Sequence, residues 1–88
     1  MTHKKENVVW ITGASSGIGK AMAHEWARLG YRVVLSARRI DVLEEIALAI
    51  RQAGGEALVV PVDVMDEKSI ANAVQRIITT WGRLDIAV

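Results

Sequence analysis

The sequence has 88 residues, of which 51% are hydrophobic and 24% are charged, and its net charge is +1; this composition is typical of a globular protein and excludes a largely disordered chain. The small net charge gives no indication of a nucleic-acid or anionic-membrane surface, and no segment reaches the ~20 apolar residues of a membrane span. Cysteine is absent, which excludes disulfides, thiolate zinc sites and a cysteine nucleophile, and we expect a cytoplasmic protein without a metal site.

Short runs rich in β-branched residues predict strands that are buried on both faces of a sheet. In chain order they cover residues 8–12, 32–36, 57–62 and 84–88. The segments between these strands repeat apolar residues at steps of three and four, which predicts helices. The first helix is expected over residues 16–29.

The second and third helices are predicted from their boundary residues as well as from their apolar stripes. Asp41 is a good N-cap, and Glu44 stands three residues later, as in a capping box. The third helix is expected over residues 67–81, with Asp66 as its cap and Gly82 as its stop.

The resulting order, β-α-β-α-β-α-β with short connections, predicts a parallel sheet with right-handed crossovers. We therefore expect an α/β fold: a Rossmann-like doubly wound parallel sheet with strand order 3-2-1-4. The first two helices should cover one face and the third helix the other, with a crevice where the order reverses, between the first and fourth strands. The chain is shorter than most complete α/β domains, so we expect the sheet to be incomplete.

Three glycines interrupt the chain between the first predicted strand and the first predicted helix. Gly13 can leave the strand with an unusual φ, Gly17 can let the backbone approach a phosphate, and Gly19 can let the helix pack closely. Together with the positive end of the helix dipole, the N–H groups of this turn would form a pyrophosphate site. The alternative is a flexible loop that only joins strand to helix.

The segment TGASSGIG, residues 12–19, resembles the T-G-x-x-x-G-x-G cofactor motif of the short-chain dehydrogenase/reductase family. Three further segments resemble the ends or approaches of the family's next strands, in the right order: SARR at 36–39, VDV at 62–64 and WGRLDIAV at 81–88. The resemblance covers the whole chain. It implies that residues 1–88 are the N-terminal part of a single NAD(P)-binding Rossmann-fold domain.

The resemblance also implies roles for individual residues of the turn. The loop from Gly13 to Gly19 would bind the pyrophosphate, with the backbone of Ile18 and the hydroxyls of Ser15 and Ser16 near the phosphates or the ribose. Helix capping is an alternative role for both serines, and it is compatible with cofactor binding. Thr12 is expected to brace the turn.

The end of the second strand bears on which nicotinamide cofactor is bound. Rossmann proteins that prefer NAD usually carry an acid there, which binds the ribose 2′-hydroxyl. Here that position is Ala37, followed by Arg38 and Arg39. A guanidinium can bind the 2′-phosphate bidentately, so we predict NADP(H) rather than NAD(H), with Arg38 as the principal contact and Arg39 or Ser15 as secondary ones. The alternative is that both arginines are ordinary solvated loop residues.

Two residues after the third strand resemble the family's adenine contacts. The carboxylate of Asp63 would meet the adenine amino group, and the backbone of Val64 would contact the ring. The competing interpretation is that Asp63 is a loop or capping residue.

The family's catalytic Tyr-x-x-x-Lys pair has no counterpart in this sequence. The only tyrosine is Tyr31, and the residue four positions later is Leu35, so we assign no catalytic residue and expect the chain alone to be inactive. The predicted function is the NADP(H)-binding portion of a short-chain oxidoreductase that acts, in a complete homo-oligomeric form, on a carbonyl or secondary alcohol. A stand-alone nucleotide-binding or regulatory module and a nonfunctional truncation remain as alternatives.

Overall fold

The computed structural model describes residues 7–88, which form a four-stranded parallel sheet with three helices. The strand order is β3-β2-β1-β4, with all neighbouring pairs parallel, which confirms the predicted fold class and topology. In chain order the elements are β1 (Val8–Thr12), α1 (Gly17–Arg28), β2 (Arg32–Ser36), α2 (Ile40–Gln52), β3 (Ala57–Val59), α3 (Glu67–Trp81) and β4 (Ile86–Ala87).

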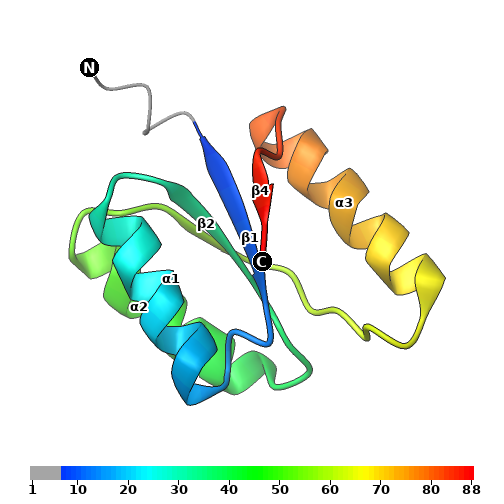
Figure 1. Cartoon of the computed structure of the whole chain (residues 1–88), viewed down its shortest axis with the longest axis horizontal. Coiled ribbons are helices and arrows are strands. Elements are labelled where there is room, and N and C mark those ends of the chain that lie inside the picture. Colours follow the sequence, from blue (N-terminus) through cyan, green and yellow to red (C-terminus); the bar gives the residue numbers. More distant parts are fainter. Residues whose placement is uncertain (1–6) are drawn as a thin grey trace.

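The helices divide between the two faces of the sheet as the crossover rule predicts. Figure 1 shows α1 and α2 together on one side and α3 on the other. Side chains alternate along β1, so Val9 and Ile11 pack in the cluster that α1 and α2 cover, whereas Val8 and Trp10 pack in the cluster that α3 covers. The central strands are therefore buried on both faces, which explains their continuous apolar sequence.

The ends of α1 and α3 agree with the predicted boundaries. Ser16 is the N-cap of α1, and its hydroxyl accepts a hydrogen bond from the Gly19 N–H. The Asp66 carboxylate accepts a hydrogen bond from the Lys68 N–H, 2.9 Å away, at the start of α3. Gly82 ends α3 with a φ of +76°, a left-handed conformation that glycine adopts without a steric penalty.

The predicted capping box of α2 is wrong. The helix begins at Ile40, so its N-cap is Arg39, whose side chain makes no capping hydrogen bond. Asp41 lies inside the first turn, where its carboxylate accepts a hydrogen bond from Arg39 Nη2 at 3.0 Å. The acid therefore pairs with a neighbouring cation instead of the helix backbone.

Two strands are shorter than predicted. Strand β3 ends at Val59: the Val60 N–H still donates to the Leu35 carbonyl, but the Val60 carbonyl accepts a hydrogen bond from the Ser36 hydroxyl. Strand β4 has two residues, although the N–H of Asp85 still donates to the Val8 carbonyl and the N–H of Val88 to the Trp10 carbonyl.

Candidate cofactor site

Parallel strands end at the same edge of the sheet, so the turns after β1, β2 and β3 come together there. Backbone hydrogen bonds join these turns directly: Ala14 N donates to the Ser36 carbonyl at 3.1 Å, and Val60 N to the Leu35 carbonyl at 3.0 Å. The edge therefore carries, on adjacent turns, every residue predicted to bind a cofactor: Gly13, Ser15, Ser16, Gly17, Ile18 and Gly19 after β1, Arg38 and Arg39 after β2, and Asp63 and Val64 after β3.

The glycine turn is held in a fixed shape by its own backbone. Gly13 has a φ of +65°, which lets the chain reverse directly after β1. Its carbonyl then accepts hydrogen bonds from both the N–H and the hydroxyl of Ser16, at 3.1 and 2.9 Å. A Cβ on Gly19 would lie 2.2 Å from the same carbonyl oxygen, so α1 can approach the turn this closely only with glycine there. The predicted roles of Gly13 and Gly19 in backbone geometry agree with the structure.

The shape of the glycine turn leaves two backbone N–H donors available at the start of α1. The N–H groups of Gly17 and Ile18 donate to no atom of residues 7–88, as expected for the first turn of a helix. A Cβ on Gly17 would have no protein atom within 4 Å, so protein packing does not require glycine at this position. Two free donors and open space at the positive end of a helix dipole fit an anionic group such as a phosphate.

The two serines of the turn differ in their hydrogen bonding. The Ser16 hydroxyl donates to the Gly13 carbonyl and accepts from the Gly19 N–H, so it performs the capping role that was the alternative to cofactor binding. The Ser15 hydroxyl, on a half-buried residue, has no hydrogen-bond partner among the described residues. Ser15 is therefore the serine whose hydroxyl is available to a ligand.

The two arginines after β2 also differ. Arg39 donates to Asp41 at 3.0 Å, in an ion pair whose side chains are 69% and 71% exposed. The hydrogen bond from Arg39 lowers the pKa of Asp41. Arg38 is exposed and makes no ion pair or side-chain hydrogen bond within the described part of the chain. Its guanidinium is thus free to bind an anion, and no acid stands at Ala37 to oppose one.

Asp63 is partly engaged within its own loop. One of its carboxylate oxygens, Oδ1, accepts a hydrogen bond from the Met65 N–H at 3.0 Å, and its own N–H donates to the Ser69 hydroxyl at 3.0 Å. Val64 is 61% exposed at the same edge. Asp63 therefore has the turn-forming role that was the competing interpretation, while Val64 is exposed beside it.

A buried polar chain across the sheet was not predicted from the sequence. Trp10 Nε1 donates to the Ser36 hydroxyl at 2.7 Å, and that hydroxyl donates to the Val60 carbonyl at 2.6 Å. Ser36 is 1% exposed, so these bonds replace the hydration that each group loses on burial. A serine that ends an apolar strand is the only signal in the sequence. These hydrogen bonds join the ends of β2 and β3, and Arg38 and Asp63 lie just beyond those ends.

Thr12 does not brace the glycine turn as predicted. Its hydroxyl donates to the Val88 carbonyl at 3.0 Å, as does its N–H at 3.2 Å, so it joins the end of β1 to the residue after β4. At the opposite end of these strands, an oxygen of Asp85 accepts the Val8 N–H at 2.7 Å. Both side chains hold β4 against β1.

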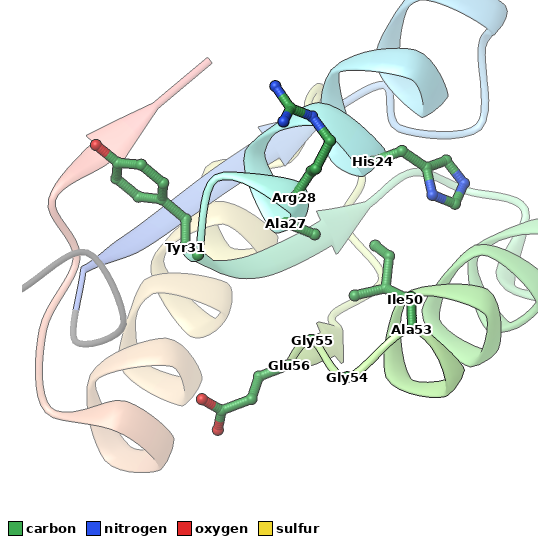
Figure 2. A pocket seen from close by; sticks show the side chains of 10 residues that line it. His24, Ala27, Arg28, Tyr31, Ile50, Ala53, Gly54, Gly55 and Glu56 are labelled. Atoms are coloured by element: carbon green, nitrogen blue, oxygen red, sulfur yellow. The ribbon is translucent and has the colours of Figure 1, made fainter. Parts of the chain in front are cut away.

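A hollow of about 630 Å³ lies away from this edge, at the other end of α1 and α2 (Figure 2). Its charged neighbours are paired: Arg28 with Glu25 and Glu56 with Arg32. The hollow precedes β2 and β3, whereas the glycine turn follows β1, so the two lie at opposite edges of the sheet. Its lining includes His24, Ala27, Arg28, Tyr31, Ile50, Ala53, Gly54, Gly55 and Glu56.

Residues 7–88 contain no group of three or more His, Asp or Glu side chains placed to hold a metal ion. Within the same residues, none of the helices has both the length and the apolar character needed to cross a bilayer.

Comparison with known proteins identifies the family. Residues 7–88 match the sequence profile described as "short chain dehydrogenase". The human protein "Dehydrogenase/reductase SDR family member 7" is 41% identical over 85 residues, which cover 92% of this chain and 25% of the human protein.

Solved structures give the same result at the level of the fold. A metagenomic short-chain oxidoreductase, crystallised in complex with NADP, is 38% identical with a TM-score of 0.89; the match covers 93% of this chain and 37% of that one. A short chain dehydrogenase from Bacillus anthracis is 44% identical with a TM-score of 0.88, over 96% of this chain and 35% of that one. This chain thus spans about a quarter to little more than a third of these relatives. It belongs to the short-chain dehydrogenase family.

Proposed function

We propose that this chain is the NADP(H)-binding portion of a short-chain oxidoreductase that transfers hydride between NADP(H) and a carbonyl or secondary alcohol. The observation that carries the proposal is the guanidinium of Arg38, which follows β2 and has no ion-pair partner among residues 7–88, with Ala37 in place of an acid. An anion-binding cation at that position favours a cofactor with a 2′-phosphate over one with a free 2′-hydroxyl. A similar structure that contains NADP supports the same choice.

The described residues divide the binding of the dinucleotide between three turns. The N–H groups of Gly17 and Ile18, together with the Ser15 hydroxyl, would hold the pyrophosphate. Arg38 would hold the 2′-phosphate, and Asp63 and Val64 would border the adenine. When bound, the nicotinamide supplies or accepts the hydride, and this chain's own contribution is to bind and orient the dinucleotide.

The acid–base step of the reaction has no candidate residue in this sequence. Tyr31 is the only tyrosine, and it packs edge-on against Trp26 with 4.7 Å between the ring centroids. We therefore propose that the 88-residue chain binds cofactor without turning over substrate. The carbonyl or alcohol substrate, homo-oligomeric assembly and a cytoplasmic location belong to the proposal for the complete enzyme.

Arg38→Asp tests the cofactor assignment by direct binding. Titration calorimetry of the 88-residue chain with NADPH and with NADH gives both dissociation constants without any turnover. We expect NADPH affinity to fall by roughly 10- to 100-fold, the effect of losing a charge-assisted hydrogen bond, and NADH affinity by no more than about threefold. Equal losses for the two cofactors would contradict the assignment of Arg38.

Arg28→Asp is the matched control, because it makes the same charge change at an exposed position at the far end of α1. It removes an exposed pair with Glu25 and the cation in the last turn of α1, and exposed interactions of this kind contribute little to stability. We expect both cofactor affinities to stay within about twofold of the parent chain. A loss of NADPH affinity in this control equal to that of Arg38→Asp would show that net charge alone governs binding.

A further inference from the structure

Two adjacent arginines after β2 have different surroundings, and an acid accounts for the difference. Arg39, the N-cap of α2, donates through Nη2 to Oδ2 of Asp41, one helical residue beyond Ile40. Arg38 has no such partner among residues 7–88. Both guanidinium groups are exposed at the same edge of the sheet, so their availability to an anion is set by pairing and not by burial.

Asp41 opposes the binding of a phosphate by Arg39 in two ways. To bind a phosphate, Arg39 must exchange the Asp41 carboxylate for the new anion, and the freed carboxylate then repels that anion from nearby. Glu45, one turn further along α2, adds a weaker charge interaction with Arg39. Asp41 itself is favoured where it stands, because a negative charge in the first turn of a helix is stabilised by the helix dipole.

We propose that Asp41 is a specificity-determining residue, whose carboxylate holds Arg39 away from the cofactor and so limits the preference for NADP(H) over NAD(H). This inference rests on the proposed function. It assigns recognition of the 2′-phosphate to Arg38 alone in the parent chain, with Arg39 as a second cation that becomes available when its pair is removed. Asp41 is a positioning residue, since it acts on the cofactor through Arg39.

The size of the effect is bounded by the exposure of the pair. Side chains that are 69% and 71% exposed are well solvated, and the attraction between the charges of such a pair is weak. We therefore expect Asp41→Asn to tighten NADPH binding by roughly two- to fivefold while changing NADH binding by less than about 1.5-fold. The gain should shrink as salt is raised, because exposed charges are screened.

A double-mutant cycle tests whether Asp41 acts through Arg39. Calorimetric titrations with NADPH and NADH are made on the full 88-residue chain and on Asp41→Asn, Arg39→Gln and the double variant, with circular dichroism as a check of folding. We expect Asp41→Asn to raise the NADPH-to-NADH preference clearly more when Arg39 is present than in the Arg39→Gln background, where only direct repulsion of the phosphate by the carboxylate is removed. Glu44→Gln is the matched control: it removes an exposed acid from the same helix, and its preference should equal that of the parent.

The outcomes separate this inference from the function on which it rests. A parent chain that fails to prefer NADPH overturns both. A parent chain that prefers NADPH, with Asp41→Asn leaving the preference unchanged or lowering it, overturns only the role of Asp41. If Asp41→Asn raises the NADPH-to-NADH preference equally with and without Arg39, the role of Asp41 is also overturned, since the carboxylate would then act on the cofactor by charge alone.

Discussion

Gly19 lies where a side chain of any size would collide with the turn after β1. A Cβ there would stand 2.2 Å from the Gly13 carbonyl oxygen, and this oxygen is backbone that also accepts two hydrogen bonds from Ser16. We expect Gly19→Ala to lower the free energy of unfolding by about 1–3 kcal/mol, the usual cost of overpacking. Urea denaturation followed by circular dichroism measures this change.

Gly17 is the matched control for this prediction, because a Cβ there meets no protein atom within 4 Å. Gly17→Ala should keep the free energy of unfolding or raise it by up to about 1 kcal/mol, since alanine is the better helix former. Its NADPH affinity should nevertheless fall, because the methyl group occupies the space assigned to a phosphate. Unchanged affinity would contradict that assignment, and a Gly19→Ala chain as stable as the parent would contradict the close approach of α1.

At the scale of elements, the pairing of β4 with β1 depends on Asp85 as well as on the strand ladder. Hydrogen bonds from Arg83 and then from the Val8 N–H lower the pKa of Asp85. A group whose pKa is lower in the folded state stabilises the fold above its unfolded pKa, and this contribution is lost as the pH falls through the folded pKa.

Asp85→Ala should therefore destabilise the chain in a pH-dependent way. We expect a loss of about 1–2 kcal/mol in the free energy of unfolding at about pH 7, and a smaller difference from the parent below about pH 3. Urea denaturation at the two pH values measures both. Glu44→Ala removes an exposed acid that accepts no such bond from residues 7–88, and it should change stability by less than about 0.5 kcal/mol. An equal loss at both pH values would show that the charge of Asp85 contributes nothing.

The elements show which parts of the structure local patterns can predict. Apolar periodicity places all seven elements, because it records which residues face the core. It does not predict that α2 begins at Ile40 with Asp41 paired to Arg39, or that β3 ends where the Ser36 hydroxyl donates to the Val60 carbonyl. These contacts join side chains to particular partners, and Ser36 lies 26 residues from Trp10 in the sequence. The edge of the sheet that carries the site was predictable, because it follows from the strand topology. Which of the two serines and which of the two arginines are available to a ligand was not predictable.

At the scale of the whole molecule, the two faces of the sheet are covered to different extents. Helix α2 contributes four buried residues to its face: Leu43, Ile46, Ala47 and Ile50. Helix α3, which is longer, buries only Ala73 and Ile77, and Ile78 is 41% exposed. Because buried apolar surface is the main source of helix stability in a folded chain, α3 is attached less strongly than α2.

We therefore expect α3 to open without the rest of the molecule. In hydrogen–deuterium exchange, amides of α3 should exchange roughly tenfold or more faster than those of α2, β1 and β2, since local opening needs less free energy than global unfolding. Ile77→Ala should accelerate exchange in α3 further and leave α2 unchanged, whereas Leu43→Ala, at an equally buried position on the other face, should accelerate exchange throughout the chain. Equal protection of α2 and α3 would show that the sheet and both helix layers unfold as one unit.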